Sequence, residues 1–192
     1  MVAEIASENP VIRRLWPADQ EQISLHFSRL GEQARRLRFG GAVSDEFVEQ
    51  YAGRLIELGS LLYGAFPDGE LRALGELRGL LDEWPVTAEA AFSVQEPWQD
   101  QGLGAALMDR VVAAAQNRGV KSLHMICLRE NEKMRHLALK HDAILHFNRH
   151  EVDAQLERPW PTPFSLAEEI AGDARGFVQA VLRWPGASTQ GA

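Results

Sequence analysis

The chain, at 192 residues and 21.4 kDa, is long enough for one domain with a substantial core and too short for two of ordinary size. Its composition, 45% hydrophobic and 24% charged, is that of a globular protein and excludes global disorder. The formal net charge of −7 argues against a nucleic-acid partner held by phosphate neutralisation.

Three features bear on the compartment. No apolar run approaches the roughly 18 residues of a membrane span, so no membrane partner is expected. A single cysteine, Cys127, excludes an internal disulfide framework and fits a reducing environment. The first residues, MVAEIASENP, lack the apolar stretch of a secretion signal. We therefore expect a cytoplasmic protein with a loose N-terminus over residues 1–10.

The N-terminal part predicts one strand followed by two helices. VIRRLW (residues 11–16) predicts a strand closed by Pro17, and residues 17–30 carry apolar side chains at helical spacing. Ser44 is a good N-cap for the helical stretch DEFVEQYAGRLIEL.

A hairpin, another strand and a helix come next. The turn signal PDG at residues 67–69 separates SLLYGAF from ELRALGELRGL and predicts an antiparallel hairpin. VTAEAAFSVQ (residues 86–95) predicts a strand. A short loop follows, and then a helix with apolar residues at every fourth position from Leu103 to Ala115.

The rest of the chain predicts two strands and two helices. VKSLHMICL predicts a strand, Asn131 can cap the helix NEKMRHLALKH, and AILHFNRHEV predicts one further strand. A Pro-rich connector, ERPWPTP, leads to SLAEEIAGDARGFVQAVLRW, which predicts a helix. The order of elements predicts an α/β fold of the mixed α+β kind, in which helices pack on one mixed sheet.

The loop before the central helix has the features of an anion site. The first amides of a helix lack intrahelical acceptors, and the helix dipole adds partial positive charge there. Gly102 and Gly104 have no Cβ, so a phosphate could approach the backbone closely. No Lys or Arg lies between Gln95 and Met108, so amides and dipoles would hold the anion. The alternative is that both glycines serve only a tight turn and close helix packing.

Two other phosphate loops fit poorly. A Walker loop needs Gly-Lys-Ser/Thr, but Ala105 and Ala106 follow Gly104. A dinucleotide fingerprint needs Gly or Ala where Leu107 stands.

The pattern that fits is Q-x-x-G-x-G, at Gln99, Gly102 and Gly104, after the strand residues AEAAFSV. With it, the chain resembles the GNAT superfamily of acyl-CoA-dependent N-acetyltransferases over residues 11–152. The pieces IRRLWPADQEQISLHFSRL, RRLRFGG, AEAAFSVQ and LRENEKMRHLALKH are similar to the bacterial protein-lysine acetyltransferase branch. The resemblance implies a GNAT fold, with a mostly antiparallel, splayed central sheet flanked by helices.

The resemblance also implies acetyl-CoA as the acyl donor; the absence of a Cys/His ligand set independently argues for no metal. The backbone of the strand around Phe92 and Val94 would pair with pantetheine, and Asn131 would help to hold it. Asn131 could equally be a plain N-cap. The residues that would bind the pyrophosphate are Gln99, Asp100, Gln101, Gly102, Leu103, Gly104 and Ala105.

Acyl transfer to an amine requires a base, because an alkylamine is almost wholly protonated at pH 7. Glu89 matches the glutamate to which the lysine-acetyltransferase branch assigns this role. It could instead be an exposed edge carboxylate or an ion-pair partner of Arg78. A backbone N–H such as that of Val94 is the expected oxyanion donor. Ala138 stands where many family members have the tyrosine that protonates the thiolate.

Other candidate groups favour structural interpretations. Cys127 is expected in the core, with a covalent acyl carrier as the alternative. The histidines form no metal-binding spacing, although alternation would place His146 and His150 on one face of a strand. The run Arg35, Arg36 and Arg38 predicts either a solvated helix face or a contact to phosphate or an acidic substrate.

We therefore expect an N-acetyltransferase domain over residues 11–153. It would transfer acetyl from acetyl-CoA to a primary amine, either a protein lysine or a small amine, by direct attack. The alternatives are a catalytically inactive acyl-CoA sensor or assembly module and a nucleotide-binding protein. Residues 154–192 are expected to pack on the same domain, where the last helix covers the substrate opening or joins a homodimer.

Overall fold

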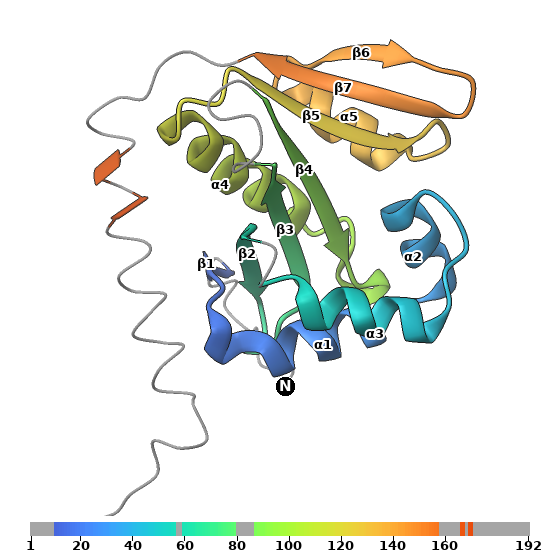
Figure 1. Cartoon of the computed structure of the whole chain (residues 1–192), viewed down its shortest axis with the longest axis vertical. Coiled ribbons are helices and arrows are strands. Elements are labelled where there is room, and N and C mark those ends of the chain that lie inside the picture. Colours follow the sequence, from blue (N-terminus) through green and yellow to red (C-terminus); the bar gives the residue numbers. More distant parts are fainter. Residues whose placement is uncertain (1–9, 57–58, 80–86, 158–165, 168, 171–192) are drawn as a thin grey trace, which may run out of the picture.

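The structure is a computed structural model that describes residues 10–56, 59–79, 87–157, 166–167 and 169–170. Its centre is one seven-stranded sheet with the order β1-β2-β3-β4-β5-β7-β6 (Figure 1). Neighbouring strands are antiparallel except for β4 and β5, which are parallel. The strands are β1 (Val11–Arg14), β2 (Leu61–Phe66), β3 (Ala73–Arg78), β4 (Thr87–Val94), β5 (Ser122–Leu128), β6 (Ile144–Phe147) and β7 (Glu151–Glu157). The predicted mixed, mostly antiparallel sheet is confirmed.

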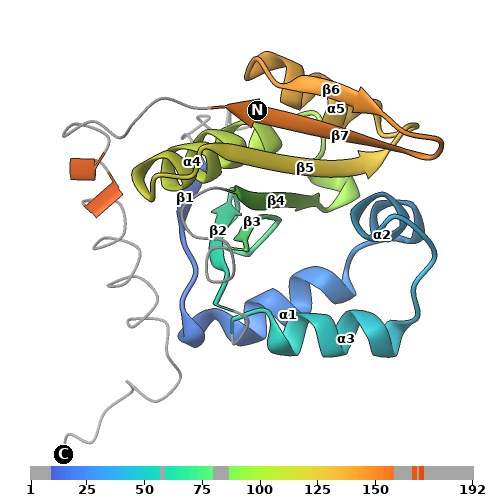
Figure 2. The same cartoon turned by 45° about the horizontal axis from the view of Figure 1, so that its top comes forward.

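Helices cover both faces of the sheet. The α-helices are α1 (Gln20–Ser28), α2 (Glu32–Phe39), α3 (Asp45–Arg54), α4 (Leu103–Asn117) and α5 (Glu132–Lys140), and short 3₁₀ turns are η1 (Pro17–Asp19) and η2 (Glu96–Trp98). Figure 2 shows α1 and α3 side by side under one face, while α4 and α5 lie on the other. The apolar positions predicted along α4, at every fourth residue from Leu103 to Ala115, are all buried.

The period-two alternation of strand side chains produces two hydrophobic cores. Leu77 of β3 and Ala90 of β4 join the core under α4. Leu74, three residues before Leu77, joins the core under α1 and α3. Glu89 and Ser93 of β4 alternate with Ala90, so they lie on the face of α1 and α3. The functional side chains of β4 and the central helix therefore lie on opposite faces.

The strands β4 and β5 separate after a short stretch of pairing. Their register contains only three pairs, which end at Glu89 and His124. β4 continues to Val94 and stays paired with β3 throughout, while β5 continues to Leu128 along β7. In Figure 1 the two strands diverge as a V, and α2 lies near its open end. Beyond Glu89, the edge of β4 that faces β5 therefore has no partner among the described strands.

The prediction of secondary structure missed one helix and one turn. The segment of the arginine run forms a separate helix, α2, which ends at Gly40 with a left-handed φ of 76°. AILHFNRHEV is not one strand, because Asn148 N–H donates to Glu151 C=O (2.9 Å) and closes a hairpin between β6 and β7. His150 therefore lies in a turn rather than on one strand face with His146. The turn has neither Gly nor Pro, so the strongest turn signals are missing from this stretch.

The predicted C-terminal helix lies mostly outside the described residues. Glu169 is described, and its carboxylate accepts hydrogen bonds from Arg118 (2.6 Å), Asn117 (2.6 Å) and Tyr63 (3.4 Å). These contacts attach this point of the chain to the end of α4 and to β2. Among the described helices, none is both long and apolar enough to span a membrane.

Candidate active site

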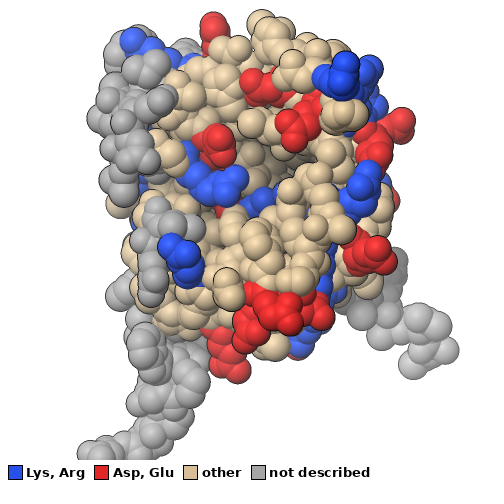
Figure 3. Space-filling view, turned by 45° about the vertical axis from the view of Figure 1, so that its right-hand side comes forward, with Lys and Arg blue, Asp and Glu red and all other residues tan. Residues whose placement is uncertain are grey.

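A cavity of about 280 Å³ lies beside the end of β4, beyond the last residue that β4 pairs with β5. The molecular surface on the side of α2 is hollowed, and basic side chains lie in the hollow (Figure 3). The lining residues come from α2, β4, the loop before α4, the start of α4, and α5: Ala34, Leu37, Arg38, Phe92, Ser93, Val94, Trp98, Gln99, Asp100, Gly102, Leu103, Gly104, Ala105, Asn131, Lys133, Met134, His136, Leu137 and Lys140. Every predicted cofactor-binding residue except Gln101 lines this cavity. Gln101 is exposed, and its side chain donates to Pro97 C=O (2.9 Å).

The loop before α4 presents free backbone donors. Gly102 is the N-cap of α4 with a left-handed φ of 81°, and Asp100 is also left-handed with φ 61°. Gly102 C=O accepts the first helical bond, from Ala106 N–H (3.0 Å). Within the described part of the chain, no acceptor engages the amides of Leu103, Gly104 and Ala105. Three N–H groups at the positive end of a 15-residue helix therefore remain available to a ligand.

The structure adds a basic side chain that the loop sequence lacks. Lys133 of α5 reaches across to the loop, where its Nζ lies 2.9 Å from Gln99 Oε1 and 2.7 Å from Asp100 Oδ2. The expectation that amides and dipoles alone hold the anion did not include this basic side chain beside the loop. Local sequence could not reveal it, because Lys133 is 33 residues beyond Asp100. Lys133 compensates a carboxylate that would otherwise repel an anion on the loop.

We expect Lys133→Met to weaken acetyl-CoA binding about tenfold, because the diphosphate would then face an uncompensated Asp100. Both side chains are largely exposed, so losing the pair should change the free energy of unfolding little. Adding Asp100→Asn to Lys133→Met should restore most of the affinity, and Asp100→Asn alone is the matched control. Isothermal titration calorimetry measures the acetyl-CoA affinity of the parent and of each variant. A double variant as weak as Lys133→Met would contradict charge compensation.

The open edge of β4 has backbone groups without a strand partner. Gln95 N–H donates to Arg72 C=O (3.0 Å), on the β3 side. Backbone direction alternates along a strand, so the N–H and C=O of Val94 and Phe92 point to the opposite side, toward the opening. Gln99 Nε2 already donates to Val94 C=O (3.2 Å), which leaves the Val94 N–H as the donor nearest the loop.

The α5 region has the asparagine of the family pattern at Asn131 and lacks its tyrosine at Ala138. Asn131 caps the helix through its Oδ1, which accepts from Met134 N–H (3.1 Å), and it also lines the cavity. Ala138 is fully buried. Its side chain is a methyl group, which has no hydroxyl to offer. Just after α5, Asp142 takes a left-handed φ of 63°, a conformation more usual for glycine. The tight turn is thus kept without glycine, at some conformational cost.

Glu89 lies outside the cavity lining, at the last paired rung of β4 and β5. Its carboxylate is half exposed and lies 3.4 Å from Arg78 Nη2. The ion pair offered as an alternative interpretation is therefore present. It does not conflict with a role as base, since an exposed pair of this kind is weak.

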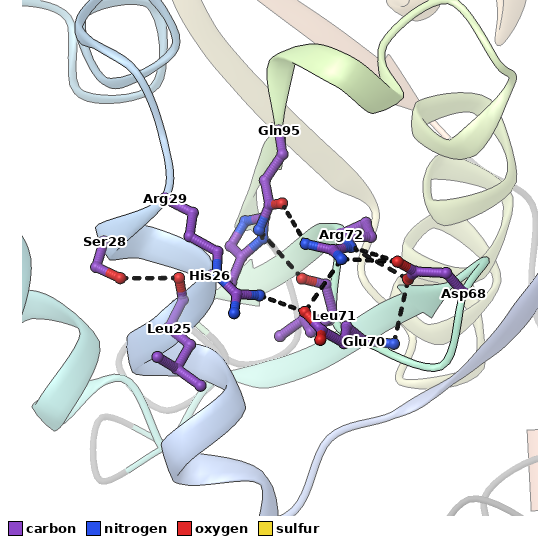
Figure 4. Close-up of polar contacts among 9 residues, drawn as sticks. All are labelled: Leu25, His26, Ser28, Arg29, Asp68, Glu70, Leu71, Arg72 and Gln95. Atoms are coloured by element: carbon purple, nitrogen blue, oxygen red, sulfur yellow. Dashed lines mark hydrogen bonds and ion pairs between the residues drawn. The ribbon is translucent and has the colours of Figure 1, made fainter.

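Sequence reasoning missed a buried polar network behind β4 (Figure 4). Gln95 Nε2 donates to Leu71 C=O (3.2 Å) and its Oε1 accepts from Arg72 (3.2 Å), which fixes the amide orientation. The same Nε2 lies 3.3 Å from His26 Nδ1, and His26 Nε2 lies 2.8 Å from Ser93 Oγ. Burial lowers the pKa of His26 to about 3, so the ring is neutral at pH 7.

This network orients the Ser93 hydroxyl. Gln95 Nε2 can only donate, so Nδ1 of His26 accepts and its Nε2–H donates to Ser93. Ser93 Oγ then keeps its own proton for another acceptor. Ser93 lines the cavity beside Val94, so the network fixes a polar group at the wall of the site.

A second network attaches α2 to the sheet. Arg38 of α2 donates to Glu76 of β3, which is completely buried, and to Tyr51 Oη (2.6 Å). Tyr51 in turn donates to Glu76 Oε2 (2.6 Å), and burial followed by the nearby Glu76 carboxylate raises the pKa of Tyr51. Arg38 is therefore an internal residue, whereas Arg35 and Arg36 form surface ion pairs. The apolar spacing of Tyr51 gave no sign of this polar contact.

Cys127 is buried, as predicted, and burial raises the pKa of its thiol. A reactive cysteine has a lowered pKa, so this side chain is unsuited to carry an acyl group. Within the described residues, no cluster of three or more His, Cys, Asp or Glu side chains is arranged to hold a metal ion.

The geometry agrees with the comparison to protein families. A model described as "Acetyltransferase (GNAT) family" matches residues 30–143, more than half of the chain. The chain belongs to the GNAT acetyltransferase family. Membership makes it an acyltransferase in general terms and implies an acyl-CoA donor. No curated protein sequence matches the chain significantly.

Solved structures share the GNAT fold. The GNAT domain of S. lividans PAT has a TM-score of 0.65 and 20% identity, covering 77% of this chain and 89% of that chain. PaiA N-acetyltransferase from Thermoplasma acidophilum, in complex with coenzyme A, has a TM-score of 0.61 and 16% identity, covering 79% and 100%. YncA from Salmonella typhimurium, with acetyl-CoA, has a TM-score of 0.57 and 19% identity, covering 81% and 99%. At these identities the likeness establishes the fold and nothing finer.

Proposed function

We propose that the chain transfers acetyl from acetyl-CoA to a primary amine by direct attack. The observation that carries the proposal is the set of free amides at Leu103, Gly104 and Ala105. These amides line the same cavity as the unpaired edge of β4. A ligand with a diphosphate and an extended amide-bearing arm satisfies both features at once.

The cofactor would lie along the cavity from loop to opening. Its pyrophosphate would take the amides of the loop over residues 99–105, with Lys133 beside them. Pantetheine amides would pair with Phe92 and Val94 as an added strand would, and Asn131 would flank them. The thioester would then reach the level at which β4 and β5 separate.

Transfer would proceed through a tetrahedral intermediate. Glu89 would remove a proton from the acceptor amine, directly or through water, so that the neutral nitrogen attacks the thioester carbon. The Val94 N–H would stabilise the oxyanion. The nitrogen of the intermediate then gives its second proton to water, the C–S bond breaks, and the CoA thiolate leaves and takes a proton from water, since Ala138 offers none.

The acceptor is either a protein lysine or a small amine. The single cysteine, Cys127, has a free thiol, which fits a cytoplasmic setting. A second candidate function is an acyl-CoA-binding sensor without catalysis. The absence of a hydroxyl at Ala138 favours it.

One experiment separates these functions. Acetyl-CoA should raise the thermal unfolding temperature of the protein under either function. An enzyme should also release free CoA thiol when a panel of lysine peptides, polyamines and small amines is added. Stabilisation without release across the panel would favour the sensor. Stabilisation by NAD or ATP, but not by CoA, would overturn both.

A further inference from the structure

Four polar side chains form a row across four adjacent strands on the face of α1 and α3. Arg78 of β3 is the register partner of Glu89 of β4, and Glu89 is the register partner of His124 of β5. His124 contacts Asp153 of β7, where its Nδ1 lies 3.0 Å from Oδ2. The family resemblance assigns only Glu89 of this row.

The row lies where β4 and β5 separate. Glu89 and His124 are the last register pair of these strands, so the opening in the sheet begins directly beyond them. Residues paired in this way on parallel strands have side chains on the same face, with strands about 4.8 Å apart. The side chains of Glu89 and His124 therefore begin at adjacent positions on one face of the sheet, and both are accessible, at 51% and 24% side-chain exposure.

Hydrogen bonds hold His124 in one tautomer. The Asp153 carboxylate can only accept, so His124 Nδ1 carries a proton and donates it. At the other ring nitrogen, Nε2 lies 3.0 Å from Ser122 Oγ, which accepts from Gln155 Nε2 (2.9 Å). Ser122 then donates its own proton to Nε2. This arrangement leaves the basic lone pair on Nε2.

The ring can take a second proton without losing a partner. If Nε2 is protonated, the Ser122 hydroxyl rotates and its oxygen accepts from Nε2–H. The Asp153 carboxylate keeps its hydrogen bond to Nδ1 in either state of the ring. An Asp-oriented histidine of this kind is an arrangement that accepts protons in catalysis.

We propose that the His124–Asp153 pair receives the proton that Glu89 removes from the acceptor amine. This inference rests on the proposed function. The proton moves from the amine nitrogen to the Glu89 carboxylate and then, through water, to the Ser122 hydroxyl, which passes its own proton on to His124 Nε2. Glu89 returns to its ionised form, and imidazolium releases the proton to solvent. His124 acts through Glu89 and is thus a positioning and relay residue.

The charged groups around the ring support this role. Glu89 from β4 and Asp153 from β7 flank His124, and Glu157 of β7 pairs with Ser122 beside it. Arg78 is held by Glu89, and Arg38 of α2, which also packs against β5, is turned toward Glu76. The charged groups next to the His124 ring are therefore mainly carboxylates, which suits a ring that becomes positively charged when it accepts a proton.

The test compares His124→Ala with the parent enzyme in a thiol-release assay. We expect a loss of about tenfold in kcat at pH 7, a loss that narrows as pH rises, and an unchanged affinity for acetyl-CoA. Added imidazole should restore much of the rate in a concentration-dependent way, because it can take the proton in place of the side chain. Asp153→Asn should likewise lower kcat at pH 7, and this loss should also narrow as pH rises. His150→Ala, in the exposed β6–β7 turn, is the matched control and should match the parent.

The outcomes separate the inference from the proposed function. An active parent enzyme whose His124→Ala variant has the same kcat and pH profile would overturn the relay alone. A loss that imidazole does not restore, accompanied by a lower unfolding temperature, would also overturn it and indicate a structural role. A parent protein that releases no thiol with any amine would instead refute the proposed function.

Discussion

Replacing Gly104 with glutamate should weaken acetyl-CoA binding by well over tenfold. Gly104 lies in the first turn of α4, where its amide has no acceptor among the described residues. A carboxylate there would occupy the space of the diphosphate and repel its charge in a partly enclosed site. Isothermal titration calorimetry with acetyl-CoA measures the loss, which at tenfold corresponds to about 1.4 kcal/mol.

The geometry of Gly104 provides controls that separate charge from bulk and folding. A Cβ at this position would meet Leu137 at 3.8 Å and Val94 at 4.0 Å, which are ordinary contacts. Gly104→Ala should therefore fold normally and lose little affinity. Gly104→Gln has the size of glutamate without its charge and should fall between the two. Equal affinity in the glutamate and alanine variants would place the diphosphate elsewhere.

The part of the site that lies within one stretch of sequence could be predicted. Strand β4, the loop and the start of α4 are consecutive. Spacing and glycine chemistry indicated Gly102 and Gly104, the family resemblance indicated Phe92 and Val94, and all four line one cavity. Amide donors at a helix start follow from the backbone alone and need no partner from elsewhere. Local signals therefore located the cavity.

The groups that come from distant segments could not be predicted. Lys133 reaches the loop only because α5 packs beside it, and His26 reaches Ser93 across 67 residues of sequence. His26 was interpreted only as part of a helix, since a single histidine on an amphipathic helix has no distinctive spacing. The partner of Glu89 at the opening, His124, depends on the parallel register of β4 and β5, which a sequence does not specify. Tertiary pairing determines these contacts.

The errors in the secondary-structure prediction have related causes. Helix α2 contains three arginines and only a short apolar stripe, so its periodicity is weak. Its position is determined by the buried pair of Arg38 with Glu76, an interaction between residues far apart in sequence. Buried charges are paired because an isolated one is costly, and that rule identifies the partner only once the sheet is known.

Replacing Glu89 with glutamine should lower the rate of acetyl transfer at pH 7 by about 10² to 10³. Glutamine keeps the size and hydrogen-bonding groups of the side chain and removes its ability to take a proton. An alkylammonium acceptor with a pKa of about 10.4 has fewer than one molecule in about 10³ neutral at pH 7. Without the base, the enzyme would depend on that fraction. Initial rates of thiol release from pH 6.5 to 10 measure the effect.

The pH dependence distinguishes a base from a structural carboxylate. As pH approaches the pKa of the acceptor amine, the neutral amine becomes abundant and the deficit of Glu89→Gln should shrink. Affinity for acetyl-CoA should stay within about twofold, because Glu89 does not line the cavity. The unfolding temperature should change little, since the pair with Arg78 is exposed. Glu46→Gln, a surface carboxylate at the start of α3, is the matched control. A deficit that stays constant across the pH range would mean that Glu89 positions the acceptor and that another group takes its proton.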